Sequence, residues 1–385
     1  MTKVLVTGAT GNVGSRVVKE LAGRGVPVRA FVRDPDRAAA ALGPVVELAV
    51  GDLADPASIQ AALEGVERVF LACGNLPPQV AYETNLIDAA ARAGVARLVK
   101  LSALGAGIGS PVDFWDWHAR IEEHLGASEI PSVVLRPRYY MTNLLAFAGT
   151  VRAAGAVFAP AEGVKIPMID PADVAATAAA VLTSDGHEGR TYELTGPESV
   201  TFHDVAAQLS EATGRPVQFV PVPDAAALDG LRQAGLPDWM ATNIVAVFAM
   251  LRQDPATQVT DAVHALTARQ PRHLSELLSG HAALFAPCPE RPFPASPGRV
   301  GRHGKVAVTH RVDGGAGSPL RPRRPASGRT ARRSGRRGRA ARPGCRTRRC
   351  GRPRPPRSGR PGRWWTAGGR SRRWSGPSAA AGGRR

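Results

Sequence analysis

The stretch that decides the fold is Val4-Leu5-Val6-Thr7-Gly8-Ala9-Thr10-Gly11-Asn12-Val13-Gly14. A short apolar run leads into three glycines spaced three apart, and an amphipathic helical pattern follows. Glycines in such a turn let the backbone approach a pyrophosphate, which then lies at the free N–H groups of a helix N-terminus. The stretch therefore predicts a dinucleotide-binding loop. The alternative is a fold of this type whose site has decayed.

The residues expected to hold the dinucleotide follow successive strands at one edge of a sheet. They are Thr7, Gly8, Ala9, Thr10, Gly11, Asn12, Val13 and Gly14 in the loop, Arg33 after the second strand, Asp52 and Leu53 after the third, Cys73 and Gly74 after the fourth, and Ser102 after the fifth. Arg33 favours NADP(H), because a cation at this strand tip suits the ribose 2′-phosphate. Asp34 follows directly, so NAD(H) stays possible. No flavin is expected.

Asp52 has two interpretations. The turn at residues 51–53 resembles one that places a carboxylate near the adenine amino group. The same side chain equally suits the capping region of the next helix.

Short apolar runs alternate with amphipathic stretches through the first half of the chain. The expected strands are residues 3–7, 27–33, 46–51, 68–72, 97–102 and 132–135, and the expected helices include 12–23, 55–63, 80–93 and 117–127. Strand–helix alternation with nearly continuous apolar strands predicts a parallel sheet covered on both faces by helices. The fold class is therefore α/β, a doubly wound, Rossmann-like parallel sheet.

Three regions follow from this pattern. Residues 1–140 are expected to form the dinucleotide-binding core. Residues 141–286 are expected to form a smaller α/β region of the same domain, with strands at 165–169, 191–194 and 217–222, helices at 172–183 and 202–213, and helical patterns from 225 to 285. Because ligands bind beyond the carboxyl ends of such strands, this second region is expected to wall the substrate pocket.

Residues 287–385 differ sharply from the rest of the chain. They carry 28 lysines and arginines against 2 carboxylates, whereas residues 1–286 carry 22 against 30. Arg, Pro, Gly and Ala make up 51 of the last 65 residues, which leaves almost no aliphatic side chains for a core. We expect a disordered tail. It is either a frameshift product of a GC-rich gene or a basic segment that binds nucleic acid, with Trp364, Trp365 and Trp374 as stacking groups.

Cysteine usage and hydropathy favour the cytoplasm. The four cysteines are too few and too scattered for a disulfide framework, and no metal-ligand spacing occurs. No charged segment precedes a long apolar run at the N-terminus, as a signal peptide would require. The most apolar window, residues 244–251, is too short to span a bilayer. No membrane contact and no metal are therefore expected.

With these residues in place, the chain resembles the NmrA-like branch of the atypical short-chain dehydrogenases/reductases over residues 1–286. The resemblance rests on residues 7–14, Arg33, 51–53, 98–105, 117–123, 135–137, Asn143 and 166–175. It implies an NAD(P)-binding protein. Members of the family include NAD(P)H-dependent quinone and azo-dye reductases, and also redox sensors that bind the nucleotide without turning it over.

One departure concerns the catalytic motif. Ordinary short-chain dehydrogenases use Tyr-x-x-x-Lys, in which the lysine lowers the tyrosine pKa. None of the five lysines of this chain follows a tyrosine at that spacing. His118 stands where the family often has lysine, so His118 and Tyr139 are the candidate catalytic residues. The alternative for His118 is a polar residue near a helix N-terminus without a catalytic role.

The missing motif favours quinone reduction over alcohol oxidation, because a quinone accepts hydride readily and positioning then suffices. Trp115, Trp117 and Tyr140 are expected to line the substrate pocket beside Tyr139, although each of these rings also suits plain packing. We expect hydride transfer to a quinone-like small molecule by a monomer or homodimer. The alternative is a catalytically silent NAD(P)-binding redox sensor that acts through a protein partner. A nucleotide-sugar or isoflavone-type reductase is disfavoured, because the lysine is missing.

Overall fold

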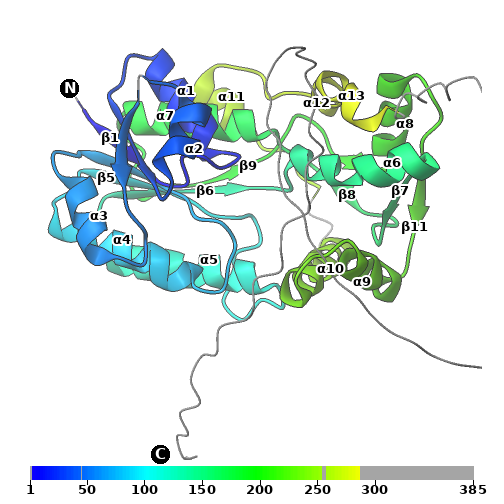
Figure 1. The fold of residues 1–385 in the computed structure, drawn as a ribbon, viewed down its shortest axis with the longest axis horizontal. Coiled ribbons are helices and arrows are strands. Elements are labelled where there is room, and N and C mark those ends of the chain that lie inside the picture. Colours follow the sequence, from blue (N-terminus) through cyan, green and yellow to red (C-terminus); the bar gives the residue numbers. More distant parts are fainter. Residues whose placement is uncertain (1, 45, 254–256, 287–385) are drawn as a thin grey trace, which may run out of the picture. The chain divides into compact units, whose positions relative to one another are not determined.

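A seven-stranded parallel sheet forms the centre of the computed structural model, which describes residues 2–44, 46–253 and 257–286 (Figure 1). The strand order is β3-β2-β1-β4-β5-β6-β9. The strands are β1 (Val4–Val6), β2 (Val28–Val32), β3 (Glu47–Val50), β4 (Arg68–Leu71), β5 (Arg97–Leu101), β6 (Ser132–Pro137) and β9 (Thr191–Leu194). Each adjacent pair is parallel, so all carboxyl ends lie at one edge.

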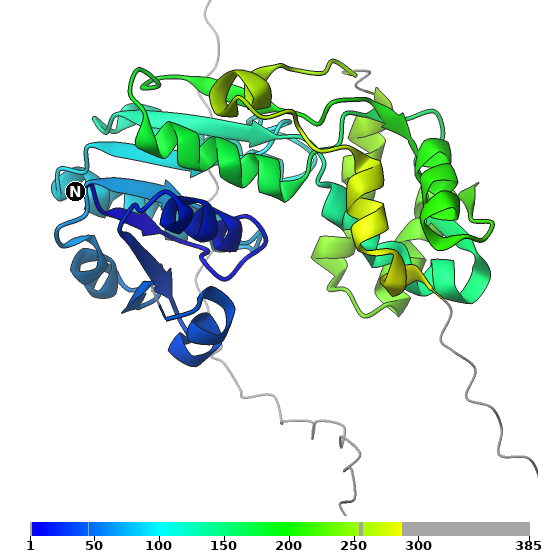
Figure 2. The ribbon, with the colours of Figure 1, turned by 90° about the horizontal axis from the view of Figure 1, so that it is seen from above.

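Helices cover both faces of this sheet (Figures 1 and 2). One face packs against α1 (Gly14–Gly23), α2 (Pro35–Leu42), α7 (Pro171–Thr183) and α11 (Ala262–Thr267), and the other against α3 (Pro56–Leu63), α4 (Gln79–Arg92) and α5 (Asp113–Ala127). Two apolar cores result, one on each side of the strands. The predicted doubly wound, Rossmann-like class is confirmed.

The strand order fixes where a ligand binds. The chain runs from β1 outward to β3 and then returns to β4 on the other side of β1. Ligands of open α/β sheets bind at such a reversal, outside the carboxyl ends of the strands. The segments after β1, β2, β4 and β5 therefore meet at one edge.

The second region has a core of its own. Its elements are η1 (Met141–Phe147), α6 (Ala148–Ala154), β7 (Ala156–Ala159), β8 (Lys165–Ile166), β10 (Val200–Thr201), α8 (Phe202–Thr213), β11 (Gln218–Pro221), α9 (Asp224–Gln233), α10 (Asp238–Gln253), α12 (Leu274–Gly280) and α13 (Ala282–Phe285). Phe202 lies at the centre of this core, with its ring near Phe147, Phe219 and Phe248. Between these elements the chain returns to the main sheet, where β9 pairs with β6 and α7 covers the strands.

The sequence missed or misjudged some elements. Helix α2 was not predicted, although Asp34 caps it through the N–H of Arg37 and Pro35 opens it. Strands β7 and β10 were not predicted. Helix α5 begins at Asp113 rather than at residue 117, and β8 covers only two of the five residues expected in that strand. The predicted basic tail lies outside the described residues. Within them, no helix is long and apolar enough to cross a bilayer.

Asn243 of α10 ties the second region to α5. Its side chain accepts a hydrogen bond from the N–H of Asp113 (2.6 Å) and donates to the Asp113 carboxylate (2.8 Å) and the Trp239 carbonyl (2.8 Å). The rings of Trp239 and Trp117 lie 6.0 Å apart beside this contact. Asn243 is 3% exposed, so its polar atoms depend on these partners.

Replacing Asn243 by leucine should therefore destabilise the protein. We expect a loss of about 1–3 kcal/mol in the free energy of unfolding, because the three hydrogen bonds of the buried Asn243 side chain to Asp113 and Trp239 are lost. Urea unfolding followed by circular dichroism measures it. The control is Thr242→Ala at an exposed neighbour, which should stay within about 0.5 kcal/mol of the parent. Equal losses in both variants would show that the contact does not hold the regions together.

Candidate active site

The turn between β1 and α1 has no room for side chains at two of its glycines. Gly8 has a φ of +59°, and a β-carbon there would lie 2.9 Å from the Ala72 carbonyl oxygen. A β-carbon on Gly14 would lie 2.2 Å from the Gly8 carbonyl oxygen. The N–H of Gly11 closes the turn on the same oxygen at 2.8 Å. The loop is therefore a compact backbone turn that leads directly into α1.

The eight predicted loop residues divide by exposure. Gly8, Thr10, Gly11 and Asn12 are exposed along the turn, whereas Thr7, Ala9, Val13 and Gly14 are buried beneath it. The exposed residues offer backbone to a ligand, and the buried ones hold the turn on the sheet. The loop therefore has an exposed backbone surface that rests on buried side chains.

Thr7 supports the loop from below. Its hydroxyl donates to the Ala72 carbonyl at 2.8 Å and accepts from the Ala72 N–H at 2.8 Å. This pair of bonds joins β1 to the end of β4. The side-chain amide of Asn12 donates a hydrogen bond to the Thr142 hydroxyl at 2.9 Å. This bond connects the loop with η1.

The tip of β2 exposes Arg33, as the sequence predicted for a residue at the ribose end of a dinucleotide. The neighbouring Asp34 carboxylate accepts the N–H of Arg37 at 3.0 Å and caps α2. After β3, Asp52 accepts the N–H of Ala54 at 2.9 Å and so shapes its own turn. The carbonyl of Leu53 accepts from the Asn85 amide at 3.1 Å, which fixes this turn against α4.

Ser102 follows β5 and belongs to a charged network. Its hydroxyl donates to the carboxylate of Glu122 on α5, and Glu122 also pairs with Arg136 of β6. This carboxylate raises the pKa of Arg136. Ser102 is buried, so the network fixes the end of β5 relative to β6 and α5.

A buried ion pair lies under the same edge, and sequence reasoning missed it. The ammonium of Lys100 on β5 is 2.8 Å from a carboxylate oxygen of Glu83 on α4, and both side chains are 0% exposed. The other oxygen of Glu83 accepts from the Gln79 amide at 2.9 Å. The signal in the sequence was a lysine inside the apolar strand Leu98-Val99-Lys100-Leu101, where both faces are buried.

His118 on α5 lies against this pair. Its Nδ1 is 3.1 Å from the ammonium nitrogen of Lys100, and the residue is 7% exposed. Burial, with the charge of Lys100 as a second cause, holds the pKa of His118 well below its ordinary value. His118 is therefore uncharged at neutral pH.

Cys73 borders the same cluster from the end of β4, beside the exposed Gly74. Burial raises the pKa of its thiol to about 11, and the charge of Glu83 adds to the shift. Cys73 is therefore a thiol rather than a thiolate at neutral pH.

The four predicted aromatic residues split between different surroundings. Trp115 packs over Gly105, whose φ is +122° and whose added β-carbon would lie 2.9 Å from the indole. Trp117 meets Trp239, and Tyr139 meets Phe248 at 6.2 Å in the core of the second region. Tyr140 packs against the core of the main sheet. Burial raises the pKa of both tyrosines well above the ordinary value.

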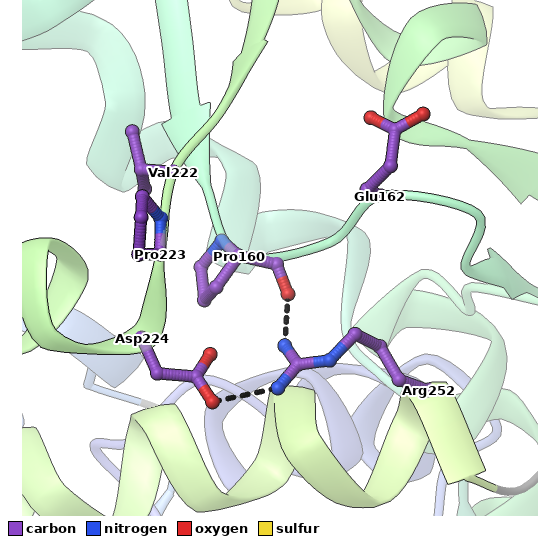
Figure 3. Close-up of a pocket in the computed structure, with 6 residues that line it drawn as sticks. All are labelled: Pro160, Glu162, Val222, Pro223, Asp224 and Arg252. Carbon is purple, nitrogen blue, oxygen red and sulfur yellow. Dashed lines mark hydrogen bonds and ion pairs between the residues drawn. The ribbon is translucent and has the colours of Figure 1, made fainter.

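Two surface hollows lie on other elements. One is lined by Pro160, Glu162, Val222, Pro223, Asp224 and Arg252, and the Arg252 guanidinium closes it by bonding the Asp224 carboxylate and the Pro160 carbonyl (Figure 3). The other is a basic groove along α1, lined by Arg16, Lys19, Glu20, Gly23, Arg24, Ala172, Arg269 and Arg272. Neither is lined by a residue predicted for the cofactor or the substrate.

The glycine turn allows a matched pair of substitutions. Gly14→Ala should lower the free energy of unfolding by about 1–3 kcal/mol, because its β-carbon meets backbone that must move. Gly23→Ala at the other end of the same helix meets nothing within 4 Å and should raise it by about 0.5–1 kcal/mol. Urea midpoints of the two variants should move in opposite directions. Midpoints that move together would contradict the close approach.

The ion pair allows a double-mutant cycle. Lys100→Met alone should lower the free energy of unfolding by about 3–5 kcal/mol, because it leaves the Glu83 charge buried without its partner. Combining it with Glu83→Gln should recover much of that loss. Thermal or urea unfolding of the four proteins measures the coupling. Purely additive losses would show that the two charges do not interact.

Comparisons with known proteins agree with this geometry. The model of the NmrA-like family matches residues 1–278. An NAD(P)H azoreductase of Xenophilus azovorans is 36% identical over 282 residues, which are 73% of this chain and 99% of the relative. Quinone oxidoreductase 2 of Escherichia coli is 35% identical over 242 residues, which are 62% of this chain and 84% of the relative.

A solved structure is similar as well. The structure of an NADPH-dependent quinone oxidoreductase from Escherichia coli, complexed with NADPH, superposes with a TM-score of 0.67 at 30% identity. The match covers 72% of this chain and 99% of that one. Sequence motifs, sheet order and relatives thus converge, and the chain belongs to the NmrA-like family.

Proposed function

We propose that the protein is an NADPH-dependent reductase that transfers a hydride to a quinone, an azo dye or a related electrophile. The observation that carries the proposal is the match to the Xenophilus azovorans azoreductase, at 36% identity and over 99% of that protein's length. The turn after β1 supports it, because it leads into a helix N-terminus, where a pyrophosphate binds. The substrate is a small molecule, and the cytoplasm is the proposed location. The proposal leaves a monomer or homodimer open.

The preference for NADPH over NADH rests on the tip of β2. Arg33 is exposed there and suits a 2′-phosphate. The Asp34 carboxylate, which would otherwise accept a 2′-hydroxyl, already caps α2. A cation without a competing carboxylate at this position favours the phosphorylated cofactor.

The proposed hydride transfer needs few catalytic side chains from the protein. NADPH supplies the hydride when bound, and no lysine follows a tyrosine at the spacing used by ordinary short-chain dehydrogenases. Tyr139 and Tyr140 keep their protons because burial raises their pKa. The segments after β4 and β5, with Cys73, Gly74 and Ser102, would orient the nicotinamide end. The protein then contributes mainly position and the exclusion of water.

Turnover tests the proposal directly. The full chain should oxidise NADPH in the presence of a panel of benzoquinones, naphthoquinones and azo dyes, measured as the loss of NADPH absorbance. A quinone-free reaction and the Gly14→Ala variant are the controls, and both should be inactive. Tight NADPH binding by calorimetry without turnover of any acceptor would reject the reductase and favour the catalytically silent sensor.

Arg33 should decide the choice of cofactor. Arg33→Ser should weaken NADPH binding by roughly 10- to 100-fold, as expected for a lost bond to a charged group, and leave NADH binding nearly unchanged. Arg37→Ser, one turn into α2, is the matched control and should change the ratio much less. Calorimetric dissociation constants for both cofactors measure it. An unchanged NADPH-to-NADH ratio in Arg33→Ser would overturn the assignment.

A further inference from the structure

The ammonium of Lys100 is surrounded by Glu83, the Leu101 carbonyl and His118. A lysine ammonium has three N–H donors and no lone pair. Its nitrogen lies 2.8 Å from a carboxylate oxygen of Glu83, bonds the Leu101 carbonyl, and lies 3.1 Å from Nδ1 of His118. The Leu101 carbonyl and Nδ1 of His118 are its hydrogen-bond acceptors, and Glu83 is its counter-ion, with the nearer oxygen outside hydrogen-bond geometry. Nδ1 of His118 must be an acceptor, because Lys100 cannot accept a hydrogen bond.

This geometry fixes the tautomer of His118. If Nδ1 accepts from Lys100, the neutral imidazole carries its proton on Nε2. Within the part of the chain that the structure describes, no hydrogen bond engages Nε2. This nitrogen is also not among the fully enclosed polar atoms that lack a partner. The Nε2–H is therefore a donor with access to its surroundings.

The support for Lys100 extends across α4. Glu83 offers one oxygen to Lys100 and accepts from Gln79 with the other, so its carboxylate cannot turn freely. The arrangement runs from Gln79 through Glu83 and Lys100 to His118. Its net charge is zero, which makes its burial tolerable.

The place of the cluster links it to the proposed reaction. Lys100 is the penultimate residue of β5, beside β4 and close to the edge where ligands bind in this fold. An uncharged imidazole N–H at such a position can donate to an oxygen that becomes negative during reduction. This function needs no proton transfer from His118.

We propose that Lys100, held by Glu83 and Gln79, is a positioning residue that keeps His118 in the Nε2–H form as a neutral hydrogen-bond donor to the carbonyl oxygen of a quinone acceptor. The proposal rests on the proposed reductase function. Net transfer of one hydride, which NADPH would supply, to the quinone leaves one oxygen protonated and the other anionic, as the hydroquinone monoanion. His118 stabilises its oxygen, and water supplies the proton that completes the hydroquinone.

The groups around His118 decide its pH behaviour. The titratable or charged side chains near it are Lys100 on β5, Glu83 on α4, Arg136 on β6, and Asp116 and Glu122 on α5 itself. Glu122 pairs with Arg136, and Asp116 pairs with Arg120, so neither carboxylate faces the imidazole unpaired. Lys100 is the charge that acts on His118 directly. Removing that charge should let the imidazole titrate closer to its ordinary range.

Nitrogen NMR of the full-length protein, labelled with ¹⁵N at its nine histidines, tests the positioning without any turnover. The His118 signals are those that disappear in His118→Gln. In the parent they should show an unprotonated Nδ1 and a protonated Nε2, unchanged between about pH 5.5 and 8. In Lys100→Met/Glu83→Gln, which keeps the cluster free of a lone charge, they should show mixed tautomers, and the imidazole should titrate at a higher pH than in the parent, because the charge of Lys100 is gone while burial remains.

A second double variant separates positioning from general damage. Arg97→Met/Glu188→Gln removes a buried cation from the other end of β5, where Arg97 pairs with Glu188. It should leave the His118 signals as in the parent. A His118 that titrates in the parent, or that carries its proton on Nδ1, would overturn the proposal. So would parent-like His118 signals in Lys100→Met/Glu83→Gln.

Kinetics test the donor role of His118. His118→Gln should lower kcat/KM for a quinone by roughly 100-fold, the usual effect of losing one such donor, and leave the NADPH dissociation constant within about twofold. His124→Gln is the matched control. This residue lies on the same helix, pairs with Asp88 on the surface, and should leave kcat/KM unchanged.

The pH dependence of quinone reduction tests the role of Lys100 separately from the donor role of His118. Lys100→Met/Glu83→Gln should reduce quinones more slowly than the parent at neutral pH, because part of its His118 population carries the proton on Nδ1 and offers no donor at Nε2. The difference should shrink as the pH falls, because a charged imidazole donates from both nitrogens. Parent-level activity in His118→Gln would overturn the donor role. If the parent reduces no quinone at all, the reductase proposal fails, and the NMR result still decides whether Lys100 sets the tautomer.

Discussion

The turn from β1 into α1 depends on close backbone contacts at Gly8 and Gly14, where a β-carbon would not fit. The Gly8 carbonyl lies so close to Gly14 that a β-carbon there would be 2.2 Å away, and Gly8 itself packs on the carbonyl of Ala72. This contact starts α1 directly after the loop, where the N–H groups of Ser15 and Arg16 already donate to carbonyls of Gly11 and Val13. The positive end of the helix dipole then faces the loop, where it favours an anion. Thr7 bonds the same Ala72 from below, so the turn is anchored to β4 as well as to β1. The position of the cofactor edge depends on this anchoring.

A second constraint is the buried ion pair at β5, the strand next to β4. The largely apolar layer between β5 and the helices α4 and α5 contains the ion pair of Lys100 and Glu83 with its partners Gln79 and His118. Such a pair adds little to stability compared with apolar packing, and either charge alone would be strongly unfavourable. Its geometry instead fixes one arrangement of α4, β5 and α5 under the edge where a ligand binds.

The sequence predicted the central sheet closely because its strands are short apolar runs separated by amphipathic helices. Strand β9 matches its predicted bounds, and β1, β2, β4 and β5 match within one or two residues. Helix α2 was not predicted because it is short and rich in alanine and buries only Ala38, although Asp34 and Pro35 mark its start. Strand β7 is a four-residue run, Ala156–Ala159, that pairs with the distant β11, and such pairing has no local signal.

The candidate site was predictable to different degrees. The loop glycines and Arg33 were proposed from spacing and position alone, and the structure places them at the ends of β1 and β2. The surroundings of His118 depend on Glu83 and Lys100, which approach it only when α4, β5 and α5 pack together. The aromatic residues were predicted as one cluster, but their contacts lie with different partners: Gly105, Trp239, Phe248 and the main core. Side-chain partners of this kind follow from tertiary packing and not from periodicity.

The central claim is that a dinucleotide binds across the carboxyl ends of β1, β2, β4 and β5. Hydrogen–deuterium exchange of the full chain, with and without saturating NADPH, tests it most directly. The account predicts slower exchange at the amides of Gly8 to Gly14 and in the segments that follow β2, β4 and β5. Protection confined to the basic groove along α1, or no protection of the glycine turn, would contradict it.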